Sequence, residues 1–160
     1  MAKVILHDRM MVVKPWWARV RIVFVGAALG LLWWVLTAIL RAYVVEPLAC
    51  RNLANAATCM DGYGIAGSIA AVIVAVVGTF ALVKTLQPRP IVIAVATAAI
   101  LWVLGYYISG LAWYEAALWG IVAYAISYVL FSLIGRMVWL PGAIITALVT
   151  VLVVRILLVI

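Results

Sequence analysis

The sequence predicts an all-α fold: a polytopic transmembrane helical bundle of about five membrane-spanning helices. Hydrophobic residues make up 71% of the 160 residues, which is more apolar surface than a soluble domain of this size can bury. These residues also form long runs of the length that a helix needs to cross a bilayer, about 20 residues. The runs do not alternate polar and apolar positions over ten-residue segments, so the sequence does not indicate a β-barrel.

Five apolar runs define the expected spans, and together they form a single transmembrane domain over residues 20–160. The spans cover residues 20–45, 63–83, 91–110, 115–135 and 141–160. Pro88 and Pro90 separate the second span from the third, because two prolines so close together cannot sit in a continuing helix. A short turn at residues 111–114 joins the third span to the fourth, and Pro141 opens the fifth.

Residues 1–19 precede the first span as an amphipathic arm that we expect on the cytoplasmic side. The arm mixes apolar residues such as Met10 and Val12 with Lys3 and Lys14, a composition typical of a segment that lies on a membrane surface. The hydrophobic region of a signal peptide is about 7–15 residues long, and the first span is far longer. We therefore expect the first span to stay in the protein as a membrane helix.

The charged residues predict the orientation. If the N-terminus is cytoplasmic, eight of the eleven basic residues fall inside, which is the positive-inside pattern of a multi-pass protein. The inside residues are then Lys3, Arg9, Lys14, Arg19, Arg21, Lys84, Arg89 and Arg136, and the outside ones are Arg41, Arg51 and Arg155. An odd number of spans puts the C-terminus outside, and we expect a bacterial inner membrane. The net charge of +7 thus reflects topology and anionic lipid rather than nucleic-acid binding.

Cys50 and Cys59 are the only cysteines, and both fall in the predicted extracytoplasmic loop. Thiols that lie close in sequence are normally oxidised in that compartment, so we expect a structural disulfide. It would close a loop of about ten residues and contribute roughly 3 kcal/mol on the chain-entropy model. A redox-active pair is the alternative, although such pairs usually have Cys-x-x-Cys spacing.

Small residues at helical spacing predict where the helices pack, because lipid offers no hydrophobic drive and association depends on close backbone approach. The expected packing positions are Gly26 and Gly30 in the first span and Gly64, Ser68, Ala71, Ala75 and Gly78 in the second. Packing within the monomer explains this pattern. An interface with a second copy or with another membrane protein explains it as well.

Polar side chains in or near the spans give two further candidate sites. Outer-face ion pairing is expected between Arg41 or Arg155 and one of the acids, in the set Arg41, Glu46, Asp61, Glu115 and Arg155. Separate charges that reach the interface are the alternative. A hydroxyl-rich intramembrane seam is formed by Tyr106, Tyr124, Ser127 and Tyr128. Such a seam lines a small-ligand or quinone pocket, or its hydroxyls bond the backbones of neighbouring helices.

The sequence predicts no catalytic residue, no cofactor and no metal site. The only histidine, His7, is in the arm, and the sequence lacks HExxH and phosphate-binding glycine loops. The expected function is therefore a non-enzymatic accessory, assembly or scaffolding component of a membrane complex. Its partners would be the lipid bilayer and a second copy or another membrane protein. The alternatives are a small oligomeric channel or transporter for a small solute, and a quinone- or thiol-linked redox protein.

Overall fold

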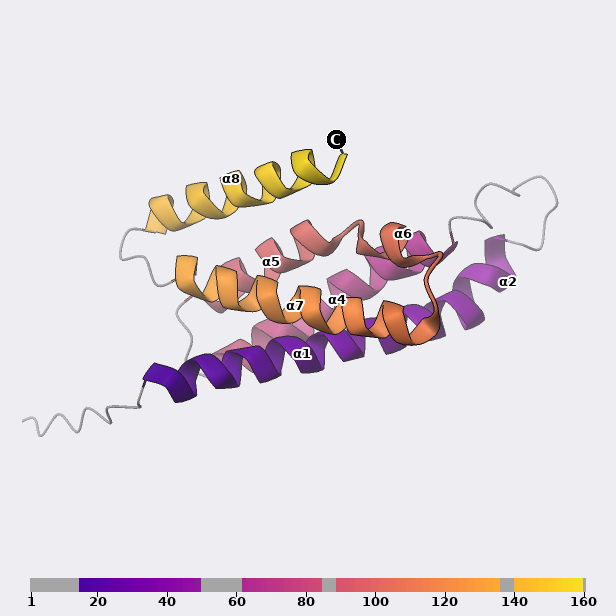
Figure 1. Cartoon of the computed structure of the whole chain (residues 1–160), viewed down its shortest axis with the longest axis horizontal. Helices are drawn as coiled ribbons and strands as arrows, with labels where there is room; N and C mark the ends of the chain where they lie inside the picture. The colour runs from indigo at the N-terminus through magenta and orange to yellow at the C-terminus, as the bar shows by residue number, and fades with distance from the viewer. Residues whose placement is uncertain (1–14, 50–61, 85–88, 136–139, 160) are drawn as a thin grey trace, which may run out of the picture.

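The computed structural model describes residues 15–49, 62–84, 89–135 and 140–159, and nearly all of these residues are helical. The long helices run up and down beside one another (Figure 1). Three helical stretches are long and apolar enough to cross a membrane: Val20–Leu48, Gly62–Lys84 and Trp113–Gly135. Large apolar side chains cover their outer faces; Phe24 is 70% exposed and Ile126 62%. This exterior fits a multi-pass membrane protein, whose surroundings are lipid.

The first helical stretch is longer than the sequence predicts. It comprises α1 (Pro15–Leu40), a π-helical turn (Arg41–Val45) and α2 (Glu46–Ala49), which follow one another without a gap. Pro47 explains the π-helical turn, because a proline has no N–H to donate to Tyr43 and its ring crowds that carbonyl. The widened turn absorbs this disruption, and the Glu46 N–H donates to the carbonyl of Arg41 instead.

Four helices pack in a ring around a common core. α1 packs against α4 (Gly62–Lys84) and α7 (Trp113–Gly135), and α5 (Pro90–Leu101) also packs against both α4 and α7. One end of this ring contains the end of α1 and the starts of α4 and α7, and we call it the Arg41 end. The opposite end, where α1 and α5 start and α4 and α7 finish, is the Lys84 end (Figure 1).

The third predicted span, residues 91–110, is not one continuous helix. α5 ends at Leu101, and α6 (Leu104–Ile108) starts after a break in which Val103 adopts φ −94° and ψ 0°. Gly105 in α6 packs against the backbone of α4: an added Cβ there would lie 3.0 Å from the carbonyl oxygen of Tyr63 and 3.3 Å from the Cα of Gly64. The break thus turns α6 so that its glycine meets α4 at backbone contact distance. Sequence reasoning missed it because neither Trp102 nor Val103 is a helix-breaking residue.

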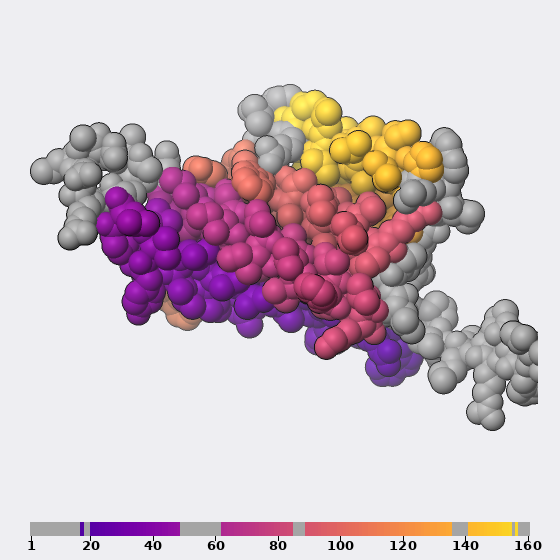
Figure 2. All heavy atoms as spheres, turned by 180° about the vertical axis from the view of Figure 1, so that it is seen from behind, coloured from indigo at the N-terminus to yellow at the C-terminus, as the bar shows by residue number. Residues whose placement is uncertain are grey.

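The predicted turn at residues 111–114 is shorter in the structure, because α7 already starts at Trp113. Glu115 then lies in the first turn of α7, where a carboxylate interacts favourably with the helix dipole. At the other end of the chain, α8 (Leu140–Val159) packs on α5 and, less extensively, on α7. Figure 2 shows α8, in yellow, on the outside of the ring beside α5.

The core of the ring is filled by large side chains from α1 and α7. Trp33, Tyr124, Tyr128 and Phe131 are each at most 1% exposed. Thr37 and Thr97 are also buried, and each hydroxyl donates to the carbonyl four residues earlier in its own helix, at 2.8 Å. These polar groups are therefore satisfied locally, as the low dielectric of a membrane interior requires.

Candidate functional site

Trp33 links three helices in the core. Its indole Nε1–H donates a hydrogen bond of 2.9 Å to the carbonyl oxygen of Gly67 in α4. On the α7 side, the ring packs on Gly120, where an added Cβ would lie 3.3 Å from it, and on Tyr124, with ring centroids 5.8 Å apart. Two glycines thus make room for one indole, and the indole joins α1 to both of its neighbours.

The small residues of α1 lie at its contact with α7. A Cβ added to Gly26 would lie 2.8 Å from the Cα of Ala125, and one added to Gly30 would lie 2.6 Å from the carbonyl oxygen of Gly120. The obstructing atoms are backbone atoms, so they cannot move aside as a flexible side chain does. This glycine pair therefore belongs to the packing of the monomer.

The small face of α4 meets three different partners along its length. The ring of Tyr106 lies against Gly64, and the hydroxyl of Tyr128 lies against Gly78. Ser68 donates to its own helix and across to the carbonyl of Trp102, just after α5, and Ala71 is fully buried. Ala75 is only half-buried, and its carbonyl accepts a hydrogen bond of 2.8 Å from Thr79. Most of the face that the sequence identified is occupied by contacts within the chain.

The predicted hydroxyl seam is divided into two separate places. Tyr124, Ser127 and Tyr128 are buried together on α7, and the two tyrosine rings stack with centroids 6.5 Å apart. Tyr106 lies elsewhere, on Gly64, whereas Tyr128 lies on Gly78, and these positions are about 21 Å apart along α4. The structure thus places Tyr106 apart from the other three residues of the seam. Ser127 and the two stacked tyrosines fill their part of the core.

The charged residues expected at the outer face are only partly described. Arg41 and Glu46 form an ion pair with Nε and Oε1 2.8 Å apart, and the Arg41 guanidinium lies 5.6 Å from the ring centre of Tyr63. Glu115 is half-buried in the first turn of α7. Arg155 is part of α8, but its side chain lies outside the described residues, as does Asp61.

The expected disulfide between Cys50 and Cys59 also falls outside the described residues, so it stays a prediction. The same holds for the amphipathic arm up to residue 14. Within the described part of the chain, no three His, Cys, Asp or Glu side chains lie close enough together to hold a metal ion.

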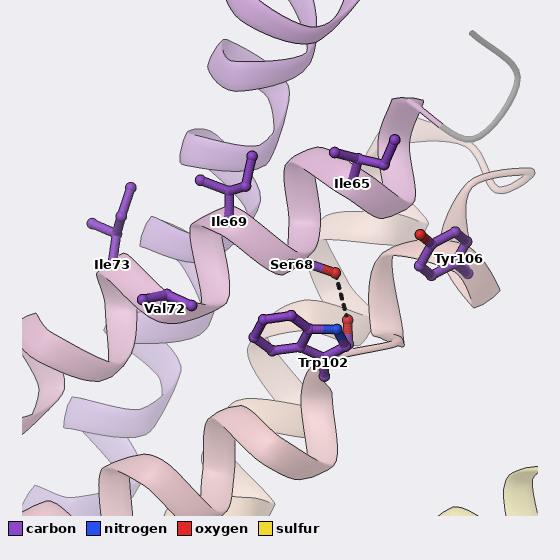
Figure 3. Close-up of a pocket in the computed structure, with 7 residues that line it drawn as sticks. All are labelled: Ile65, Ser68, Ile69, Val72, Ile73, Trp102 and Tyr106. Carbon is purple, nitrogen blue, oxygen red and sulfur yellow. Dashed lines mark hydrogen bonds between the residues drawn. The ribbon is translucent and has the colours of Figure 1, made fainter. Parts of the chain in front are cut away.

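A cavity of about 470 Å³ opens on the outer surface beside the break between α5 and α6. Its apolar wall is a strip of α4, and its polar side is formed by Ser68, Trp102 and Tyr106; the apolar lining residues are Ile65, Ile69, Val72 and Ile73 (Figure 3). The Ser68 hydroxyl bridges two backbone carbonyls, that of Gly64 at 3.0 Å and that of Trp102 at 3.2 Å. It thereby satisfies a carbonyl at the helix break.

The sequence pointed to two of the three polar residues of this cavity. Ser68 was expected as a helix-packing position, and Tyr106 as part of the hydroxyl-rich seam. Trp102 was missed because a tryptophan within an apolar run is not distinguishable from an ordinary lipid-facing residue. Gly105 was the available signal, since glycine is unfavourable within a helix and often marks a close approach.

At this cavity a helix break, polar hydrogen-bonding groups and an opening to the exterior coincide. The ring core, in contrast, uses its polar groups for packing. The chain matches no protein-family model, no curated protein and no solved structure.

Proposed function

We propose that this protein is a five-span protein of the bacterial inner membrane and serves, without catalysis, as an accessory, assembly or scaffolding component of a membrane complex. In this proposal the fourth and fifth spans are α5 together with α6, and α8, which run alongside the three long helices (Figure 1). Five passages leave the start of α1 and the end of α8 on opposite sides.

The distribution of charge supports a cytoplasmic N-terminus. Arg21, Lys84 and Arg89 lie toward the Lys84 end, where α1 starts. At the Arg41 end, the basic residue Arg41 is paired with Glu46, and Glu115 adds a further acid. An excess of Lys and Arg at one end is what the positive-inside rule predicts for the cytoplasmic side of a membrane.

The observation that carries the scaffolding role is the position of α8. The ring core is filled by Trp33, Tyr124, Tyr128 and Phe131, and this packing supports a rigid body rather than a pathway through the monomer. α8 is attached to the outside of that body through Ala143 and Ala147, which are buried. Its remaining surface is apolar and open; Ile145, Leu148, Val149, Leu152, Val153 and Ile156 are all exposed. This helix is the natural contact for a neighbouring membrane protein.

The test is purification of the tagged protein from its native membrane in a mild detergent, followed by mass spectrometry. We expect a stoichiometric partner that is lost in a Val149→Trp/Leu152→Trp variant of α8. The matched control is Val122→Trp/Ile126→Trp on the exposed face of α7, which should retain the partner. Recovery of the protein alone, as a defined oligomer in both variants, would contradict the accessory role.

Orientation is tested by labelling with a membrane-impermeant maleimide in whole cells. In a chain with Cys50 and Cys59 replaced by serine, a single cysteine at Glu46 should be labelled from outside, and one at Arg89 should not. In the unaltered chain, Cys50 and Cys59 should react only after reduction if they form the expected disulfide. Labelling at Arg89 alone would reverse the proposed topology.

One observation favours a second candidate, a small oligomeric channel or transporter. Backbone breaks at membrane depth are tolerated where they line a cavity, and discontinuous helices form the binding sites of many transporters. The α5–α6 break beside a cavity has this character. Solute flux into liposomes that contain the purified protein distinguishes this candidate, because a scaffold produces none above that of empty liposomes.

A further inference from the structure

We propose that the cavity at the α5–α6 break binds a neutral, lipid-soluble carbonyl compound of the quinone class. The inference starts from the hydrogen-bonding groups around the cavity. Ser68 uses its hydroxyl hydrogen on the carbonyls of Gly64 and Trp102, which leaves its oxygen as an acceptor. Among the described residues, no hydrogen bond engages the indole N–H of Trp102 or the hydroxyl of Tyr106. Two donors therefore border the cavity.

These donors lie on one side of the cavity, across from its apolar wall. Figure 3 shows the nitrogen edge of the Trp102 indole below Ser68, and the Tyr106 hydroxyl turned toward α4. Trp102 and Tyr106 are 41% and 44% exposed, so a ligand arriving from the surroundings can reach both. Two donors of this kind suit carbonyl oxygens, which accept hydrogen bonds and carry no charge.

The apolar wall indicates that the ligand also has a hydrocarbon part. Ile65, Ile69, Val72 and Ile73 form a strip along α4 that is about 12 Å long from the first residue to the last. A hydrocarbon tail lies along such a strip without leaving polar groups unsatisfied. The cavity of about 470 Å³ is within the range of small-molecule sites, which also combine apolar walls with a few polar groups.

Depth decides between a quinone and the ester groups of a phospholipid. α4 has 23 residues, and Ser68 is five residues from its central residue, Ile73, so Ser68 lies roughly 8 Å from the middle of the helix. The hydrocarbon core of a bilayer extends about 15 Å on each side of its centre. The part of the cavity beside Ser68 therefore opens into hydrocarbon when α4 spans the membrane, several ångströms below the ester and phosphate groups, whereas Tyr106, which packs on Gly64, lies about 14 Å from the middle of α4, near the edge of the hydrocarbon. A neutral ring with carbonyls is stable beside Ser68, whereas phospholipid ester groups could reach that depth only by drawing their charged phosphate into the hydrocarbon.

The experiment uses the full-length protein in phospholipid nanodiscs and ubiquinone with a decyl tail as the probe. Indole ¹⁵N–¹H spectra contain one signal for each tryptophan, and Trp102→Phe assigns the signal of Trp102. We expect saturable movement of the Trp102 signal on addition of the probe and no comparable movement of the signal of Trp119, an exposed residue of α7. Equal, non-saturating shifts of both signals would mean simple partition into lipid and would overturn the proposal.

Two pairs of variants sharpen the result. Tyr106→Phe should weaken binding of the probe about three- to tenfold, the usual effect of one hydrogen bond, whereas Tyr107→Phe, the neighbouring exposed tyrosine outside the cavity lining, should leave it unchanged. Val72→Phe should obstruct the cavity and abolish saturation, and Val76→Phe, one turn farther along α4, should not. A Trp102 signal that responds to phospholipid composition but not to the probe would identify the occupant as a phospholipid and reject the quinone. These outcomes are independent of α8 and its partner, so the two proposals fail separately.

Discussion

The indole nitrogen of Trp33 donates a 2.9 Å hydrogen bond to the carbonyl oxygen of Gly67, although the two residues are 34 positions apart. The acceptor is a backbone carbonyl inside α4, and the absence of a side chain on Gly67 allows the indole to approach it. A Cβ added to Gly67 would lie 3.3 Å from the Trp33 ring and 3.2 Å from the Cα of Gly105. Gly67 therefore holds α1 on one side and α6 on the other.

Replacing Trp33 by phenylalanine tests this connection. The variant loses the hydrogen bond and leaves part of the space of a fully buried indole empty. We expect destabilisation of about 1–3 kcal/mol, from a hydrogen bond of about 0.6 kcal/mol in a membrane protein plus a cavity term. The measurement is unfolding in mixed micelles of mild detergent and dodecyl sulfate. Trp119→Phe, at an exposed position, is the control, and equal stability of the two variants would contradict the role of Trp33.

Gly30 offers a second test, because its contact is with backbone. An alanine Cβ would lie 2.6 Å from the carbonyl oxygen of Gly120, so Gly30→Ala must push α1 and α7 apart. We expect a loss of about 1–3 kcal/mol, as for overpacked cores, despite the better helix propensity of alanine. Gly110 has nothing within 4 Å of its added Cβ, so Gly110→Ala should be nearly neutral. The same unfolding assay compares the two, and a neutral Gly30→Ala would show that the helices separate easily.

Much of this architecture could be predicted from local sequence signals. The long apolar runs indicated α1, α4 and α7, because in lipid the length of an apolar run is itself the signal. The two prolines marked the separation of α4 from α5, although α5 starts at Pro90 itself, one residue before the predicted span. The helix in fact passes beyond the predicted end at residue 45, because a π-helical turn accommodates Pro47 instead of ending the helix.

The site could not be predicted in the same way. The break at Trp102 and Val103 accompanies the close contact of Gly105 with α4, and such tertiary contacts leave no periodic trace in the sequence. The predicted tyrosine seam combined residues of two separate helices. Spacing within each helix does not determine how far along the bundle axis the residues of one helix lie from those of the other. Tyr106 and Tyr128 consequently lie against opposite parts of α4.

The ion pair between Arg41 and Glu46 should contribute little to stability. The two side chains are 46% and 45% exposed, and exposed pairs contribute about 0.2–1 kcal/mol in double-mutant cycles. We expect a coupling energy below about 1 kcal/mol from Arg41→Gln, Glu46→Gln and the double variant, and a decrease with added salt. Tyr63→Leu in the same background measures the cation–π contact separately. A coupling that is larger and insensitive to salt would mean that the pair is shielded from water.

The hydroxyl of Tyr124 should be dispensable for folding. Tyr124 is 1% exposed, and its oxygen has no hydrogen-bond partner among the described residues. A buried hydroxyl without a partner costs free energy, so its removal is neutral or favourable. Tyr124→Phe keeps the ring contacts with Trp33 and Tyr128, and we expect stability unchanged or raised by up to about 1 kcal/mol. The unfolding assay in mixed micelles measures this directly. A loss of 1 kcal/mol or more would show that the hydroxyl is bonded in the folded protein, by a water molecule or by a bound ligand.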